Sequence, residues 1–521
     1  MAEERSDSGL TGYTDPEILN LMESVSGHGH FSLRISTLER CVSAVKRCSQ
    51  GDVSNLMKDP YIGRFFIAVQ HVLQAAIIPP FDSRYYFSYC EDDFKGFSQI
   101  TELVLSLISE LINLWKQHLT EGDRLKTSSF NSTAKSMEIN FVTKGDDTDI
   151  PDFSWLYSNQ MKLLIIIGAH LKCGLWSSTR TQMLSNMLLQ QLMINHNNSV
   201  SEFLCAKTRF CPVSESIPKY RSDWEKSSLL TQILDHCKLP LGKEQWQKNP
   251  FLAEAFTWTI SNVRIPHLSD HINQIMVTSL NFIDDHQAVN KVRGIKLLHH
   301  LLQNTSAEEM RWYNRAEVIY ESLKHQLYSK ELEVQQNLWP CLLSLLQVLE
   351  PGRSDHELIR HHDVFETLLR EAESENLLAI RRVYMIQLKD FTTQIGIGCV
   401  RHLKTLVRVI EQYLEIEDGP EDQARCGALA LLHTVITVAW PRLNQHMQKI
   451  VHSLCKFLLD INSNDATIGQ ISSDARMHMN EQAVDILKLL KQIAPNLQPC
   501  LKALKESNVL ANLEPILKRV L

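Results

Sequence analysis

Apolar residues recur along this chain at the i, i+3, i+4 and i+7 spacing that places them on one face of a helix. The clearest case is the segment 100–119, ITELVLSLISELINLWKQHL, which has one apolar and one polar face. Runs of β-branched residues that alternate with polar residues and end at turns, the pattern typical of strands, do not occur. The pattern therefore predicts an all-α fold with essentially no β-sheet.

The helical pattern becomes periodic from residue 265 onward. Each repeat unit is expected to be a helix pair. The first helices of the pairs are expected to begin near Pro266, Glu309, Asp355, Cys399 and Pro441. Successive units are then 43, 46, 44 and 42 residues apart. HEAT and armadillo repeats have a period of about 40–47 residues. Because one pair leaves an apolar face uncovered, such pairs stack on one another. We therefore predict a HEAT-like α-solenoid over residues 265–521, with about five hairpins and a terminal cap at 497–521.

Local signals support these boundaries. The segments 306–309 and 354–357 both fit a capping box, in which a Ser side chain accepts a backbone N–H and a Glu three residues later returns the bond. Pro266 and Pro441 suit the first turn of a helix, where the missing N–H leaves no hydrogen bond unmade. The dipeptides Trp339–Pro340 and Trp440–Pro441 are expected to be core and helix-start elements.

The first half of the chain is less regular. Residues 1–30 are polar and are expected to be loosely ordered, and residues 31–250 read as an irregular N-terminal helical region. Within that region the segment 120–151 is rich in Ser, Thr, Asp, Gly and Lys and has no sustained periodicity. This composition predicts a flexible loop.

Composition places the chain among folded proteins of a reducing compartment. Of its 521 residues, 44% are hydrophobic and 22% charged, and the formal net charge is -7. No stripe of Lys and Arg with aromatics is present, so direct nucleic-acid binding is not expected. The N-terminus has no apolar signal region, and the apolar run 163–169 is too short to span a membrane. The 12 cysteines are scattered without a C-x-x-C pair, which suits buried thiols in the cytoplasm and nucleus.

The sequence contains few residues in patterns that indicate catalysis or ligand binding. It lacks the glycine-rich phosphate loops and the G-x-S-x-G elbow, and its histidine pairs have no partners at a metal-ligand spacing. Asp284 and Asp285 could act as an acid–base pair, but at a turn between helices they are better interpreted as caps and as part of a hydrogen-bonded ladder between repeats. We therefore expect no catalytic, cofactor-binding or metal-binding residues.

Three features of the sequence could contribute to binding a partner or to packing between the helix pairs. The stretch 280–302 is expected to form the turn and second helix of one hairpin. Its structural signature consists of Asp284, Asp285, Val292, Arg293 and Gly294. Of these, Gly294 is expected at a point of tight helix packing. Arg381 and Arg382 are candidates for partner contacts on the inner surface, with helix solubilisation as the alternative. The acidic segment 415–422 is expected to be a solvated loop, with docking of a basic partner as its alternative.

These residues also carry a family resemblance. The segment 283–302, IDDHQAVNKVRGIKLLHHLL, with the segment 313–329, YNRAEVIYESLKHQLYS, closely resembles the Tel-two-interacting protein two family. Proteins of that family form the smallest subunit of the triple-T complex. The similarity is strongest over residues 283–346 and continues more weakly through the C-terminal hairpins.

The resemblance implies a non-catalytic scaffold of HEAT type without cofactors. It implies a hetero-oligomer with Tel-two and Tel-two-interacting protein one that acts as a co-chaperone adaptor. Together with the ninety-kilodalton heat-shock chaperone, that complex would mature and stabilise the phosphatidylinositol-3-kinase-related kinases, which serve the DNA-damage response, nutrient signalling and telomere maintenance. No small-molecule substrate, membrane or nucleic acid is implied. An importin-like HEAT adaptor for cargo transport is the alternative.

Overall fold

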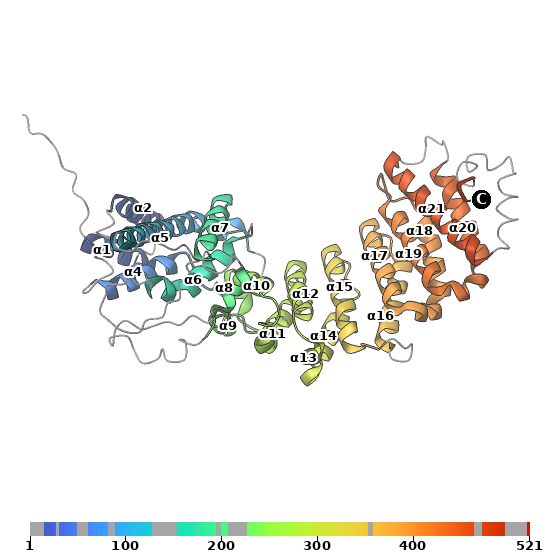
Figure 1. Ribbon diagram of the computed structural model, residues 1–521, viewed down its shortest axis with the longest axis horizontal. Coiled ribbons are helices and arrows are strands. Elements are labelled where there is room, and N and C mark those ends of the chain that lie inside the picture. Colours follow the sequence, from blue (N-terminus) through green and yellow to red (C-terminus); the bar gives the residue numbers. More distant parts are fainter. Residues whose placement is uncertain are drawn as a thin grey trace, which may run out of the picture. The chain divides into compact units, whose positions relative to one another are not determined.

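The structure is a computed structural model that describes residues 15–27, 31–48, 61–81, 89–127, 154–172, 174–193, 199–206, 227–352, 358–462, 471–494 and 518–520 (Figure 1). Throughout these ranges the secondary structure is helical and contains no β-strand, which confirms the all-α prediction. The chain divides into two compact units, residues 1–274 and 275–521.

The first unit is built from nine α-helices in its described part: α1 Asp15–Ser24, α2 Phe31–Arg47, α4 Ile62–Ala75, α5 Phe97–Thr127, α6 Ser154–His170, α7 Thr179–Met193, α8 Val200–Cys205, α9 Leu229–Lys238 and α10 Pro250–Asn262. Short 3-10 turns lie between them: η1 Val25–Gly27, η2 Glu91–Phe94, η5 Trp246–Lys248 and η6 Ser269–His271. Helix α6 is central, because it contacts α4, α7, α9 and α10. Its run of buried residues from Leu163 to Ile167 is explained by these neighbours on several sides.

A glycine sets the distance between α6 and α10. A Cβ added at Gly168 would lie 2.5 Å from Cε3 of Trp258, so the indole ring occupies the space that a side chain would need. The flexible loop predicted for residues 120–151 starts too early, because α5 continues to Thr127. The rest of that loop, residues 128–151, lies outside the described residues.

The second unit consists of helix pairs. The first helix of each pair is α11 Ile272–Ile283, α14 Arg315–Lys324, α16 Ile359–Ser374, α18 Leu403–Glu415 and α20 Met447–Ile461. The second is α12 Ala288–Gln303, α15 Leu332–Leu349, α17 Leu378–Ile395, α19 Gln423–Ala439 and α21 Ser473–Ile493. The first helices start at residues 272, 315, 359, 403 and 447, and so at intervals of 43, 44, 44 and 44 residues. This constant step is the HEAT-like period of about 40–47 residues.

Contacts between the pairs follow the stacking expected of a solenoid. Helix α12 packs on α15, α15 on α17, α17 on α19 and α19 on α21, while α16 packs on α18 and α18 on α20. The stretch 423–445, which contains α19, and the stretch 92–114 are apolar and long enough to cross a membrane by length and composition alone. Because α19 contacts helices α17, α18 and α21, we assign it to the core of the array.

Several helix starts differ from those expected from the sequence. Cys399 and Pro441 lie in the 3-10 segments η8 Gly396–His402 and η9 Trp440–Gln445, which precede α18 and α20. The capping box at Ser306 and Glu309 is confirmed and opens the short helix α13 Ala307–Arg311, which 3-10 segment η7 Trp312–Asn314 joins to α14. The second proposed capping box, at 354–357, lies outside the described residues, as do residues 497–517 and 521 of the proposed cap.

The two Trp–Pro dipeptides occupy different environments. Trp339 is fully buried and its indole N–H donates to Gln335, but Pro340 lies inside α15 and does not begin a helix. Trp440 begins η9 and is 56% exposed, so it is not a core residue. It directly follows the last residue of α19 as the C-cap of that helix.

Candidate protein-interaction surface

The signature turn joins α11 to α12 through a chain of polar contacts. Asp285 is 7% exposed, and its carboxylate accepts a 2.6 Å hydrogen bond from Asn290 Nδ2 and faces His286 Nδ1 at 3.1 Å. Asn290 Oδ1 in turn accepts from Arg293 at 3.0 Å. Asp284 is exposed at the same turn. The two acids therefore occupy different environments and share no cleft, and Asp285 organises the turn.

Gly294 allows α12 to approach α11. A Cβ at this position would lie 2.5 Å from the carbonyl oxygen of Ser279 and 2.6 Å from Cγ1 of Ile283. Real Cβ atoms do not come this close, so only a hydrogen fits there. Val292 is buried on the same helix, and the Arg293 guanidinium lies 5.6 Å from the centre of the Phe282 ring. All three signature residues of α12 thus hold one helix pair together.

The two candidate arginines of α17 both engage groups of this chain. Arg381 is 5% exposed, lies 3.7 Å from the centre of the Tyr413 ring and donates to the carbonyl of Glu375. Arg382 donates to both carboxylate oxygens of Asp418, at 2.7 and 2.9 Å. Its side chain remains 38% exposed. Arg381 therefore joins helices, and a partner role for either arginine stays a prediction.

The acidic segment 415–422 is not a uniformly solvated loop, because two of its carboxylates are buried. Asp418 accepts from Arg382 and from the backbone N–H of Ala424 at 2.9 Å, and so caps α19. Asp422 lies 3.4 Å from Arg425, whose other nitrogen is 2.9 Å from Asp460 of α20. Burial raises the pKa of Asp422 to about 6, against the opposing effect of Arg425. Arg382, which pairs with Asp418, lies on α17 and is distant in sequence, so the local sequence did not indicate that Asp418 is buried.

His361 and His362 of α16 serve packing between repeats. His361 is buried between Glu350, 2.8 Å from Nδ1, and Gln394, whose amide nitrogen is 2.7 Å from Nε2. Because that amide can only donate, Nε2 accepts and the proton lies on Nδ1. Burial lowers the pKa of His361, and Glu350 opposes that shift. His362 contacts His402 of η8 at 3.0 Å. No group of three or more His, Cys, Asp or Glu in the described residues is placed to hold a metal ion.

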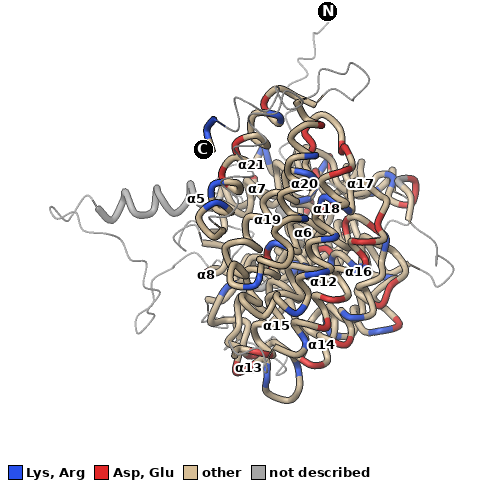
Figure 2. The backbone as a smooth tube through the Cα atoms, turned by 90° about the vertical axis from the view of Figure 1, so that its right-hand side faces the viewer, with Lys and Arg blue, Asp and Glu red and all other residues tan. Residues whose placement is uncertain are grey.

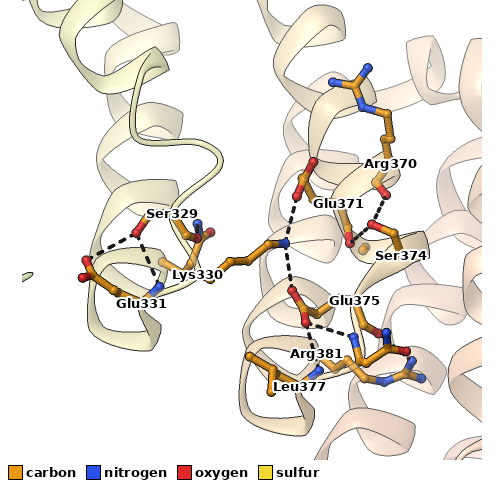
Figure 3. Close-up of polar contacts among 12 residues, drawn as sticks. Ser329, Lys330, Glu331, Arg370, Glu371, Ser374, Glu375, Leu377 and Arg381 are labelled. Atoms are coloured by element: carbon orange, nitrogen blue, oxygen red, sulfur yellow. Dashed lines mark hydrogen bonds and ion pairs between the residues drawn. The ribbon is translucent and has the colours of Figure 1, made fainter.

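Charged side chains link successive repeats along the first helices of the pairs, here called the outer helices. Figure 2 shows acidic and basic residues interspersed along three of them, α16, α18 and α20. Three junctions carry such pairs: Arg360 with Glu317, Arg408 with Glu373, and Lys449 and Lys456 with Glu411 and Glu415. Lys330 adds a bridge from the α14–α15 turn to Glu371 and Glu375 at the end of α16, at 3.0 and 3.1 Å (Figure 3).

The second helices of the pairs are here called the inner helices, and three of them border a shallow hollow. It has a volume of about 240 Å³ between α17, α19 and α21 and is lined by Lys389, Ala430, His433, Gln482 and Asp485 among others. The hollow is a shallow depression in a surface made by three helices.

Large apolar side chains are exposed where the outer helices begin. Tyr313 is 86% exposed, and Trp312, Ile397 and Trp440 are between 56% and 59% exposed. Tyr313 also has a φ of 56°, a left-handed conformation that a bulky residue rarely adopts. Exposed Trp and Tyr are the residue types that anchor protein interfaces. The sequence did not identify them as exposed, because a Trp at the end of a helix looks the same whether its neighbours cover it or leave it open.

The comparisons with known proteins concern mainly the region around this array. Residues 238–419 match the model of the Tti2 family. TELO2-interacting protein 2 of Rattus norvegicus is 33% identical over 321 residues, which cover 60% of this chain and 59% of that protein. The Homo sapiens protein of the same name is 32% identical over 321 residues, covering 60% of each chain. The alignment thus spans less than two thirds of the length of these relatives.

Two of the solved structures that match this chain are a Kap121p mutant and an importin-beta. A mutant of the karyopherin Kap121p covers 95% of this chain and 44% of its own, with 11% identity and a TM-score of 0.45. Yeast importin-beta covers 97% of this chain and 57% of its own, with 11% identity and a TM-score of 0.41. At these scores the likeness does not distinguish a transport receptor from another helical array. The resemblance drawn from residues 283–346 is confirmed by the family match, because those residues lie within the segment 238–419 that matches the Tti2 family model.

Proposed function

We propose that this chain is a non-catalytic scaffold, an adaptor subunit of the triple-T complex that binds Tel-two and Tel-two-interacting protein one. The observation that supports this best is the Tti2-family match over residues 238–419. This region includes the signature turn and the helix pairs from α11 to α18. The names of the relatives describe proteins that interact with TELO2.

The architecture is compatible with such a role. Helix pairs that stack with a constant step expose a long series of turns and helix faces, and arrays of this kind bind partners over extended surfaces. The buried ionisable groups of the array have partners within the protein: Arg425 faces Asp422 and Asp460, and His361 faces Glu350. Their perturbed surroundings therefore fit a structural network better than a catalytic one.

The finer proposal concerns what the complex does. As an adaptor, the chain would act with the ninety-kilodalton heat-shock chaperone in the maturation and stabilisation of phosphatidylinositol-3-kinase-related kinases. This places it in the cytoplasm and the nucleus. Its connection to the kinases and the chaperone would be indirect, through the other subunits.

Affinity purification of the tagged full-length chain from cells tests the proposal. We expect Tel-two and Tel-two-interacting protein one to be recovered in near-stoichiometric amounts, with the large kinases and the chaperone in lower amounts. Depletion of the chain should then lower the steady-state level of those kinases without lowering their messenger RNAs. Recovery of transport receptors or the GTPase Ran, without the triple-T subunits, would support the importin-like alternative and contradict the proposal.

A further inference from the structure

Two segments at the C-terminal end of the array are basic and lack acidic residues. Residues 396–410 contain Arg401, Lys404 and Arg408, and residues 440–459 contain Arg442, Lys449 and Lys456, with no Asp or Glu in either. This one-sided charge stands out in a chain whose formal net charge is -7. Each segment covers a 3-10 turn and most of the outer helix that follows, η8 with α18 and η9 with α20.

The two segments are neighbours in the fold. Both η8 and η9 contact α19, and α18 contacts α20. The starts of α18 and α20 therefore lie at the same edge of two consecutive helix pairs. Ile397 and Trp440, each 56% exposed, lie on the two 3-10 turns of this edge.

Part of the positive charge is neutralised within the array and part is not. Arg408 pairs with Glu373, while Lys449 and Lys456 pair with acids of α18. In contrast, Lys404 and Arg442 are exposed and form no ion pair with any residue that the structure describes. The uncompensated cations thus belong to the same edge as the exposed Ile397 and Trp440.

The opposite end of α18 has the reverse charge and offers a comparison. Ile416 is 45% exposed there, a value similar to those of Ile397 and Trp440. Its neighbours in the chain are Glu415 and Glu417, so the surroundings of this apolar residue are acidic. Exposed apolar side chains at the two ends of α18 therefore lie among charges of opposite sign.

We propose that Ile397, Arg401, Lys404, Trp440 and Arg442, here called the basic edge, dock an acidic segment of a protein partner. An apolar side chain of that segment would cover Trp440, and its carboxylates would pair with Lys404 and Arg442. Trp and Arg are over-represented among the residues that contribute most to protein interfaces, and unpaired charges at a rim steer oppositely charged partners. The inference rests on the proposed function, because it takes the partner to be a subunit of the proposed complex.

A protein fits this edge better than a nucleic acid does. Nucleic-acid affinity depends on neutralising a series of phosphates with a continuous set of cations. Beyond the basic edge the cations of α20 are already paired with acids of α18, Lys449 with Glu411 and Lys456 with Glu415, so no continuous set of free cations follows along these helices. A short acidic segment that ends within two repeats needs no such continuous set.

The test measures binding of the full-length chain to purified Tel-two-interacting protein one and to its complex with Tel-two. Two variants address the edge: Trp440→Ala, and the double charge reversal Lys404→Glu with Arg442→Glu. Two variants serve as matched controls: Ile416→Ala for loss of an exposed apolar side chain, and Arg370→Glu for reversal of an exposed cation on α16. Because all five side chains are exposed, the thermal midpoints should stay close to that of the wild type.

We expect each edge variant to weaken the affinity by about tenfold or more and each control by less than about twofold. Added salt should reduce the wild-type affinity more than that of the double charge reversal. A photo-crosslinking amino acid at position 440 should attach to an Asp- or Glu-rich segment of the partner, and one at position 416 should not.

The possible failures are distinguishable. If neither the wild type nor the controls bind the two subunits, the proposed function is wrong and the assignment of the basic edge falls with it. If the wild type binds and the edge variants bind equally well, only the assignment of the edge is wrong. That assignment is also wrong if the edge variants lose affinity for a duplex RNA probe while their affinity for the subunits is unchanged.

Discussion

At Gly294 the absence of a side chain determines how two helices meet. The carbonyl of Ser279 and the side chain of Ile283 occupy the place where a Cβ would stand. The sequence allowed this prediction, because a lone glycine within an apolar helical pattern usually marks a close approach. It did not allow the burial of Asp418 to be predicted, since its partner Arg382 comes from another helix and is distant in sequence.

Gly294→Ala should lower the free energy of unfolding by about 1–3 kcal/mol, because the added methyl group forces α11 and α12 apart. Gly63→Ala in α4 is the matched control, since a Cβ there meets nothing within 4 Å. That substitution should leave stability unchanged or raise it by up to about 1 kcal/mol through helix propensity. Thermal unfolding followed by circular dichroism measures both changes. Equal effects of the two substitutions would contradict the close contact at Gly294.

Among the helices, the turn between α16 and α17 has its own capping arrangement. Glu375 is 6% exposed and accepts 2.9 Å hydrogen bonds from the backbone N–H groups of Asn376 and Leu377 at the start of α17. Lys330, from the preceding helix pair, donates to the same carboxylate (Figure 3). Burial tends to raise the pKa of Glu375, but the Leu377 N–H and Lys330 outweigh burial, so the pKa is lower than usual. One carboxylate therefore caps a helix and joins two repeats.

Glu375→Ala should lower the free energy of unfolding by about 2 kcal/mol, because the backbone donors of α17 lose their partner in a buried place. Lys330→Ala should cost less than about 1 kcal/mol, because its side chain is 52% exposed and water screens its ion pairs. Chemical denaturation at neutral pH measures the difference between the two. Since the folded pKa of Glu375 is lowered, its contribution is present above the usual carboxyl pKa and should be lost as acidification passes the folded pKa. A larger loss from Lys330→Ala would contradict this ranking.

At the scale of the whole molecule, buried cysteines lie in the core of each of the two units. Cys41 and Cys237 are buried in the first unit, and Cys341 and Cys399 are buried in the second. Burial raises the pKa of Cys41 and Cys237 to about 12 and that of Cys399 to about 11, and it raises the pKa of Cys341 as well. Cys90, in contrast, is exposed. Thiol reactivity therefore separates surface from core, because the thiolate is the reactive form.

Brief treatment of the native protein with iodoacetamide at neutral pH should modify Cys90 and leave Cys41, Cys237, Cys341 and Cys399 intact. The buried four should react only when denaturant unfolds the unit that contains each of them. Mass spectrometry of tryptic peptides measures the extent of modification at each site. Alkylation of Cys341 at the rate of Cys90 under native conditions would show that the core of the second unit opens readily.

The fold class and the family could be predicted from the sequence, because apolar spacing and the stretch 283–302 are local properties of the chain. The position of each surface residue could not, since exposure depends on which helix packs nearby. Trp339 and Trp440 illustrate the difference. Both precede a proline, yet one is fully buried and the other is 56% exposed. The basic edge was likewise not recognisable until η8 and η9 were found beside the same helix.

The ion pairs between the outer helices give the array a direction. At each of the three junctions with such pairs, the cation belongs to the later helix and the carboxylate to the earlier one. Along the outer helices each repeat therefore presents cations toward the preceding repeat and carboxylates toward the following one. Elsewhere the polarity is reversed, because Lys330, Arg382 and Arg425 bind carboxylates of the following repeat. A repeat inserted in reversed order would bring like charges together in both places, so the two polarities together fix the order in which the repeats stack.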